Sequence, residues 1–265
     1  MAIGITGILE AAAAAFVAGS VNSVSGGGTL ITFPVLLALG MPSIRANATS
    51  TVALWPGIIA SIGGYRKELG GAGGWAAMLL GPSICGGVLG AFLLLRTPHK
   101  DFDKIAPFLV LMATLLFLCH GLVSRMLKKN VSDLPEGEAV EPRLTPRLIA
   151  AYVVFQFVVA IYGGYFGAGM GILMLAALGM MGLTNIHRMN GLKAWAAFCI
   201  NGVAVTIFAA NHIVDWPVGL SMAAGSIAGG YFGARMARRV GQTAVRRTII
   251  TIGFIATISL LIRQW

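Results

Sequence analysis

Charged side chains are scarce in this sequence, and acidic ones are the scarcest. Asp, Glu, Lys and Arg together account for 11% of the residues, against about 25% in an ordinary soluble domain. Apolar residues account for 57%, and the mean hydropathy is +0.84. This composition excludes an ordinary soluble domain and indicates a polytopic membrane protein. About ten spans of roughly 20 residues would fill almost the whole chain.

The motifs of several catalytic and cofactor-binding classes are also missing. Cys85, Cys119 and Cys199 each stand alone in an apolar run, with neither a CxxC pair nor a metal-ligand spacing. The glycine runs are not framed by alternating strands and helices, and no P-loop occurs, so neither a nucleotide cofactor nor ATP hydrolysis is expected. We therefore expect no metal, no cofactor and no enzymatic activity.

The basic residues, which give a net charge of +10, lie in short runs between apolar segments. A nucleic-acid-binding protein gathers such residues on one solvated face, so we expect no nucleic-acid partner. Short basic runs beside apolar segments are typical of membrane orientation signals.

Part of the chain recurs at a constant offset of 143 residues. Arg45-x-Asn47 recurs as Arg188-x-Asn190, and Gly26 and Gly28 recur as Gly169 and Gly171. The longest match pairs Ser83-Ile84-x-Gly86-Gly87-x-x-Gly90-Ala91 with Ser226-Ile227-x-Gly229-Gly230-x-x-Gly233-Ala234. Two matching halves with glycine-broken segments in an apolar chain are typical of a transporter whose site lies between the repeats.

Apolar runs predict an all-α fold of about ten helices, arranged as two inverted five-helix repeats. The predicted helices cover 4–24, 29–41, 45–65, 75–95, 105–125, 147–166, 169–183, 187–211, 216–235 and 245–263. The helices over 29–41 and 169–183 reach only about 20 Å, so each is a half-helix or a broken span entered through glycines. The first helix lacks a basic start and contains Glu10, which favours a retained helix over a signal peptide.

We expect one membrane domain in which residues 1–125 form repeat 1, 126–146 a cytoplasmic linker and 147–265 repeat 2. Whether the short helices cross the membrane or re-enter from one side is left open by their length. If they cross, one face collects Arg66, Lys67, Arg125, Lys128, Lys129, Arg143, Arg147, Arg188, Arg235, Arg238, Arg239, Arg246 and Arg247. The other face then carries only Arg45, Arg96, Lys100, Lys104 and Arg263. The positive-inside rule therefore favours crossing, with the linker and the loop over 236–245 in the cytoplasm.

The first candidate site is the glycine-rich entry to each short helix. In the first half it comprises Asn22, Ser25, Gly26, Gly27, Gly28 and Thr29, and in the second half Gly169 and Gly171. Glycine lets the backbone turn sharply, and the amides from Thr29 to Ile31 are free donors at a helix N-terminus, suited to a small oxyanion. Close helix packing is the alternative role for these glycines. For the Gly-Gly-x-x-Gly-Ala motifs we expect packing only.

The second candidate site is the polar start of the following helix in each half. It comprises Arg45, Asn47, Thr49 and Ser50 in the first half and Arg188, Asn190, Lys193 and Asn201 in the second. Both arginines lie near helix ends, where snorkelling to the interface is the alternative role. Lys193 lies about two turns into its helix, where a lysine is costly unless it faces a partner or a wet cavity. It is the strongest candidate ligand for an anion, and Glu10 is its candidate charge partner or a proton carrier.

These residues resemble the sulfite exporter TauE/SafE family of bacterial membrane proteins. The resemblance rests on Ser25-Gly-Gly-Gly28 with Pro34, Leu36-Leu-Ala-Leu-Gly40 and Ala46-x-Ala48-Thr-Ser50, then on residues 167–171 and Asn201. In the family the second glycine motif commonly runs on into a proline, whereas here Met170 interrupts the glycines and Ala177 replaces the proline.

The resemblance implies a secondary transporter, an exporter of sulfite, organosulfonates or related small anions across the bacterial inner membrane. The expected partners are a small anionic substrate and the lipid bilayer, and a homo-oligomer is left open. An anion channel is the first alternative function. A membrane-embedded enzyme is the second, although no acid/base pair, nucleophile pair or metal cluster in the sequence supports it.

Overall fold

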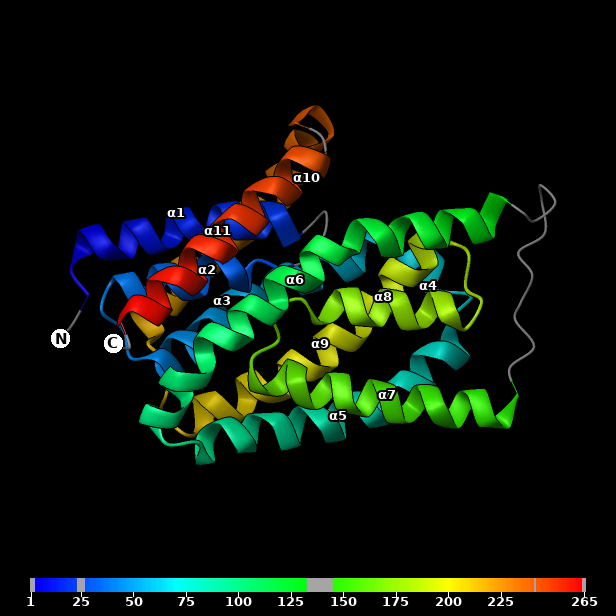
Figure 1. Ribbon diagram of the computed structural model, residues 1–265, viewed down its shortest axis with the longest axis horizontal. Coiled ribbons are helices and arrows are strands. Elements are labelled where there is room, and N and C mark those ends of the chain that lie inside the picture. The colour runs from blue at the N-terminus through cyan, green and yellow to red at the C-terminus, as the bar shows by residue number, and fades with distance from the viewer. Residues whose placement is uncertain (1–2, 23–26, 133–144, 241, 264–265) are drawn as a thin grey trace.

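The computed structural model describes residues 3–22, 27–132, 145–240 and 242–263, and all elements in these ranges are helices. The first half contains α1 (Ile5–Asn22), α2 (Thr29–Ala38), α3 (Ser43–Gly64), α4 (Arg66–Leu69), α5 (Gly73–Arg96) and α6 (His99–Ser132). The second half contains α7 (Pro146–Tyr165), α8 (Met170–Met180), α9 (Ile186–Ala210), α10 (Trp216–Val240) and α11 (Gln242–Arg263) (Figure 1). The all-α fold is confirmed, and so are the two short helices.

Several helix boundaries differ from the sequence-based prediction. The predicted loop over 236–245 is wrong, because α10 continues to Val240 and α11 begins at Gln242. Six of the ten residues there are Met, Ala, Arg or Gln, which favour helix. Likewise α6 continues through residues 126–132, which were assigned to the linker, since no proline interrupts the chain there. The rest of the linker, apart from its last two residues, lies outside the described residues.

Five helices of the described chain are long and apolar enough to cross a membrane. They are α1, α5, α6 from His99 to Cys119, α7 and α9. The helices α2 and α8 and the segment Arg247–Ile262 are apolar but shorter. The composition of these helices agrees with the expected membrane-spanning fold, and their lengths leave open whether the short helices cross.

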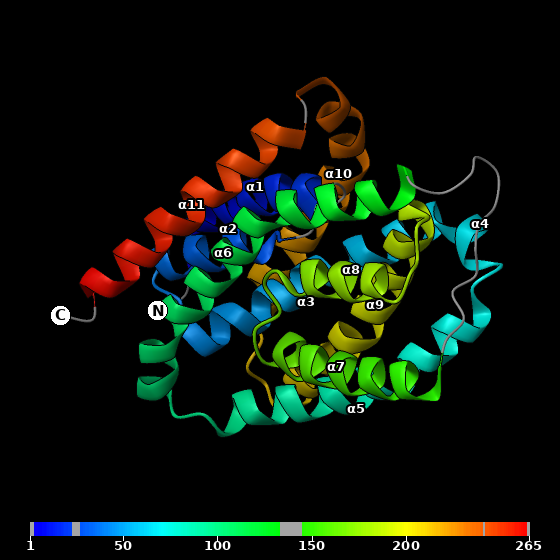
Figure 2. The same ribbon diagram turned by 45° about the vertical axis from the view of Figure 1, so that its right-hand side comes forward.

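The helices of the two halves pack on each other in reciprocal pairs. Helix α1 lies along α10, and its counterpart in the second half, α7, lies along α5 (Figures 1 and 2). In the same way α3 packs on α10 and α9 packs on α5, while α3 contacts α9 and α6 contacts α11. Helix α10 therefore packs against α1 and α3 of the first half, and α5 packs against α7 and α9 of the second half. Neither half forms a separate bundle.

The repeated glycine motif makes these cross-half contacts close. A Cβ atom on Gly86 of α5 would lie 2.6 Å from the carbonyl oxygen of Phe157 on α7. At the equivalent position in α10, a Cβ atom on Gly229 would strike the carbonyl oxygen of Phe16 on α1. Only glycine allows two helix backbones to approach this closely. The predicted packing role is confirmed for this pair of positions.

One pair of equivalent residues is in direct contact. Trp55 of α3 stacks on Phe198 of α9, with ring centroids 5.4 Å apart and an interplanar angle of 11°. The Trp55 indole also donates a hydrogen bond to the Phe198 carbonyl at 3.2 Å, across a separation of 143 residues in the chain. The α3–α9 crossing therefore brings equivalent positions of the two halves into contact.

Candidate functional site

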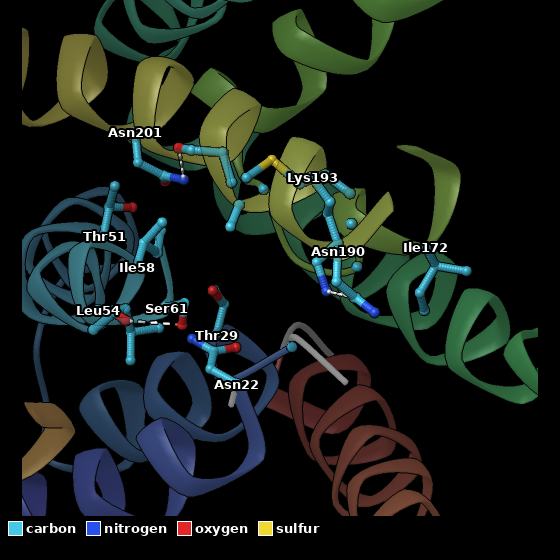
Figure 3. Close-up of a pocket in the computed structure, with 18 of the residues that line it drawn as sticks. Asn22, Thr29, Thr51, Leu54, Ile58, Ser61, Ile172, Asn190, Lys193 and Asn201 are labelled. Carbon is cyan, nitrogen blue, oxygen red and sulfur yellow. Dashed lines mark hydrogen bonds between the residues drawn. The ribbon is translucent and has the colours of Figure 1, made fainter. Parts of the chain in front are cut away.

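A cavity of about 110 Å³ lies beside the α3–α9 crossing. Its walls come from both halves of the chain: the end of α1, the starts of α2 and α8, and one side each of α3 and α9. Figure 3 shows Asn190, Lys193 and Asn201 of α9 facing Thr51, Ser61, Thr29 and Asn22 of the first half across this space. The other lining residues are Gly27, Leu54, Gly57, Ile58, Tyr65, Phe166, Gly167, Gly169, Met170, Gly171, Ile172, Ala194 and Ala197.

Both glycine-led helix starts line this one cavity, as the repeat predicts. Gly27 has φ 110° and Gly169 has φ 78°. Residues other than glycine rarely adopt such positive φ angles. A Cβ atom on Gly27 would also strike the ring of Phe117. Glycine is therefore required at the first entry for two reasons, its backbone angle and the aromatic ring of α6 beside it.

Most of the amides expected to be free at the α2 start are in fact bonded. Leu30 N donates to Gly27 O at 3.0 Å, and Ile31 N donates to Gly28 O at 2.9 Å. These tight turns are common at helix N-termini and satisfy donors that an ideal α-helix leaves free. Within the described chain, the Thr29 amide in α2 and the Gly171 amide in α8 have no acceptor. Each short helix thus presents one free backbone donor at the cavity.

Three pairs of equivalent residues line the cavity from α3 and α9. Thr51, Leu54 and Ile58 line the cavity from α3, and their equivalents 143 residues later line it from α9. Those equivalents are Ala194, Ala197 and Asn201. The spacing of three and four residues places each set along one face of its helix. Equivalent faces of α3 and α9 therefore line the cavity, but the side chains on the two faces differ.

Lys193 is the only charged residue among the described residues that line the cavity. Its ammonium nitrogen donates to Asn190 Oδ1 at 2.9 Å, and Asn190 Nδ2 donates to the Ile186 carbonyl at 2.9 Å. A Cβ atom on Gly171 would lie 3.1 Å from Lys193 Cδ, so the lysine stem packs directly over this glycine. The α8 entry and Asn190 together fix where the charge lies.

Two further asparagines predicted as ligands also line the cavity. Asn22 Oδ1 accepts a hydrogen bond from the Gly28 amide at 2.8 Å, which leaves its NH₂ group free to donate to a ligand. Asn201 Nδ2 donates to the Ala197 carbonyl one turn earlier at 2.8 Å. Gly28 itself is buried just behind the wall, where a Cβ atom would lie 2.9 Å from the Ala18 carbonyl. Ser25 and Gly26 lie outside the described residues.

The other predicted site residues of the first half lie outside the cavity lining. Asn47 Nδ2 donates to the Tyr165 carbonyl at 2.9 Å, and Thr49 Oγ1 accepts from the Asp215 amide at 3.0 Å. Ser50 is fully buried and shares a 2.5 Å hydrogen bond with Thr32 of α2. These side chains join α3 to α7, to the start of α10 and to α2, so their contacts are structural.

The three remaining candidates are also outside the cavity. Arg45 is exposed and lies beside a separate hollow with Asp215. Arg188 donates from Nη2 to the Gly71 carbonyl at 3.1 Å, a contact between the second half and the first. Glu10 is exposed on α1 and makes no ion pair with Lys193 in the described chain. The structure therefore separates the acid from its candidate charge partner.

The predicted site did not include three polar lining residues: Thr51 and Ser61 of α3, and Tyr65, which directly follows α3. Thr51 donates to the Asn47 carbonyl at 2.9 Å and Ser61 to the Gly57 carbonyl at 3.1 Å, each one turn earlier in the helix. With Leu54 and Ile58 they follow the spacing of one helix face. This spacing is visible in the sequence, but the sequence does not say which face of α3 meets α9.

Comparison with known proteins agrees with this architecture. The family model described as "Sulfite exporter TauE/SafE" matches residues 11–260. A "Probable membrane transporter protein" of Haemophilus influenzae is 30% identical over 252 residues, which cover 94% of this chain and 92% of the relative. A "Probable membrane transporter protein ORF9" of a Sinorhizobium species is 29% identical, with 94% and 90% coverage.

A third relative, "Probable membrane transporter protein YfcA" of Escherichia coli K12, is 25% identical over 93% of this chain and 87% of its own length. No solved structure matches the chain significantly. The matches and the apolar helices together identify a multi-pass membrane transporter protein. The chain belongs to the sulfite exporter TauE/SafE family.

Proposed function

We propose that the protein is a secondary transporter that exports sulfite, an organosulfonate or a related small anion across the bacterial inner membrane. The observation that carries the proposal is Lys193, a lone cation in a cavity lined by both glycine-led helix starts. An intramembrane lysine is costly, and it persists where it has a functional partner. The family of the chain supports an anion that contains sulfur.

The size of the cavity favours a small substrate. Its volume of about 110 Å³ is well below the 300–1,000 Å³ typical of pockets for drug-sized ligands. Free donors face the space from several directions, namely Lys193, the Asn22 amide group and the backbone amides of Thr29 and Gly171. An anion with several oxygens on one central atom offers acceptors to donors of this kind.

We propose alternating access as the transport mechanism because the two ends of the α3–α9 pair differ. Asn47 ties the last carbonyl of α7, that of Tyr165, to α3. The equivalent bond would join Asn190 to the Asn22 carbonyl, but Asn190 bonds instead within its own helix, and both asparagines line the cavity. Exchange of these two arrangements would close the cavity at its present end and form one at the other end.

We propose that the repeat is inverted, an arrangement that would suit this mechanism. The reciprocal packing of α1 on α10 and α7 on α5, with Trp55 against Phe198, agrees with two halves related by a two-fold axis. We propose that this axis lies in the membrane plane, with repeat 1 over 1–125 and repeat 2 over 147–265. The linker between them would then be cytoplasmic, as the basic residues indicate.

Solute counterflow in liposomes tests the proposal. We expect vesicles that contain the purified protein and unlabelled sulfite or sulfonate to accumulate the same labelled anion transiently. A carrier exchanges internal unlabelled anion for external labelled anion, which produces this accumulation. A channel would dissipate the gradient without this overshoot. The matched control is Lys193→Met, which retains the length of the side chain and removes its charge. Counterflow equal in wild type and Lys193→Met would show that the cavity is not the site.

A further inference from the structure

We infer that the cavity selects a singly charged oxyanion, such as hydrogensulfite or a monosulfonate, over a doubly charged one. The inference rests on the proposed function and concerns the same site. Its basis is the charge content of the wall: one ammonium group and no carboxylate among the described lining residues. One cation balances one negative charge, and the wall would leave a second charge on the ligand without a partner.

The repeat shows that a second cation is missing from an equivalent position. Ser50 occupies the place in α3 that Lys193 occupies in α9, and the helices cross next to the cavity. Instead of facing the cavity, Ser50 is fully buried against Thr32. The equivalent position therefore adds no charge to the cavity, whose described lining carries the single ammonium group of Lys193.

Other charged groups are held away from the cavity. Arg188 donates to the Gly71 carbonyl, and Arg45 lies beside the separate hollow near Asp215. Glu10 is exposed on α1. None of the three lines the cavity, so none can balance a second ligand charge at short range.

The remaining donors suit the oxygens of a monoanion. The Lys193 ammonium has three hydrogens, and Asn190 accepts one of them, so two can point to a ligand. The amides of Thr29, Gly171 and Asn22 add neutral donors. Neutral donors can bind the oxygen atoms of a ligand without adding charge to the wall. They therefore suit a ligand that has three or more oxygens and a single negative charge. A neutral sulfone would gain these hydrogen bonds but lose the interaction with the ammonium group.

A charge series of sulfur compounds tests the inference. Dimethyl sulfone, methanesulfonate and sulfate share tetrahedral sulfur and carry charges of zero, one and two. Binding is measured with purified protein by isothermal titration calorimetry. We expect methanesulfonate to bind at least about tenfold more tightly than either of the others, since a tenfold ratio needs only a small free-energy difference. Sulfate binding as tight as methanesulfonate would overturn the inference and leave the proposed function intact. Absence of binding for all anions, sulfite included, would overturn both.

Two variants sharpen the same test. Ser61→Lys places a second ammonium group on the opposite wall, and Ser61→Met is its uncharged control of similar bulk. We expect Ser61→Lys, but not Ser61→Met, to raise the affinity for sulfate relative to that for methanesulfonate by about tenfold. An unchanged ratio in a folded Ser61→Lys protein would contradict the inference.

A pH series on the wild-type protein needs no variant. Sulfite loses its last proton as pH rises, whereas methanesulfonate keeps one charge. We expect sulfite affinity to fall more steeply with rising pH than methanesulfonate affinity does, because only sulfite gains a second charge. Rising sulfite affinity under these conditions would overturn the inference.

Discussion

Equivalent residues of the two halves serve different purposes. In the first half, Asn47 and Ser50 are buried and bonded to other helices, so they hold the molecule together. In the second half, Asn190 and Lys193 bond to each other and face the cavity. The same backbone position can therefore serve as a packing contact or as part of the cavity wall, depending on what its neighbours offer.

The neighbouring short helix accounts for part of this difference. Ser50 has a hydrogen-bond partner in Thr32 of α2. The residue equivalent to Thr32 in α8 is Leu175, a buried apolar side chain that can accept nothing from Lys193. The stem of Lys193 packs over Gly171 instead, and its ammonium group donates to Asn190 of its own helix. Equivalent positions therefore hold a buried hydroxyl in one half and a cavity-lining ammonium group in the other.

The largest effect is expected at Lys193. Lys193→Met should weaken anion binding about 100-fold, because a hydrogen-bonded charge in a sheltered site contributes a few kcal/mol. The equivalent change in the first half, Ser50→Ala, should leave affinity within about threefold and lower stability instead. Calorimetry and thermal unfolding of both variants give the two readouts. Since Glu10 lies elsewhere, the loss should persist in Lys193→Met combined with Glu10→Gln. Recovery of binding in that double variant would contradict the ligand role.

Glycine at the helix contacts should matter equally in both halves. Gly86→Ala and its equivalent Gly229→Ala should each destabilise the protein by about 1–3 kcal/mol, since the added Cβ meets a backbone carbonyl that cannot move aside. The control is Gly230→Ala, where the nearest atom is 4.0 Å away. Thermal unfolding in detergent measures all three. A stable Gly229→Ala protein beside an unstable Gly86→Ala protein would show that the reciprocal packing is not equivalent.

The asparagine pair should separate stability from binding. Asn47→Ala should cost about 1–3 kcal/mol of stability, because it leaves the Tyr165 carbonyl without its donor. Asn190→Ala should cost less, since its bonds lie within its own helix and to Lys193. It should instead reduce anion affinity several-fold by releasing the ammonium group. The two measurements are unfolding temperature and ligand affinity, and identical profiles for the two variants would refute the asymmetry.

The smallest effects are expected at the paired entry glycines. In Gly171→Ala the new Cβ meets only the flexible stem of Lys193, at 3.1 Å, so affinity should fall by no more than about fivefold. In Gly28→Ala the new Cβ lies 2.9 Å from the Ala18 carbonyl, so stability should fall instead. The same two assays distinguish these results. A Gly171→Ala protein with normal affinity but lower stability would place this glycine among the packing positions.

Local patterns in the sequence determined where the helices lie and which helices of the two halves correspond. Apolar runs define the spans because bilayer thickness sets their length, and the glycines before α2 and α8 mark both short helices. The offset of 143 residues also led to the expectation that both helix starts share one cavity. The sequence also predicted Lys193 as the charged residue of the site, because a lysine so deep in an apolar helix has few other roles.

Only the tertiary structure decided which side of each helix meets the cavity. Arg45 and Arg188, equivalent and polar, both turned out to lie outside it, whereas Thr51, Ser61 and Tyr65 line it. The rotation of α3 is fixed by bonds from Asn47, Thr49 and Ser50 to residues of other helices, two of them in the other half. Such contacts join residues far apart in the chain, and their geometry depends on how all the helices pack together. The sequence of α3 by itself therefore does not predict this rotation.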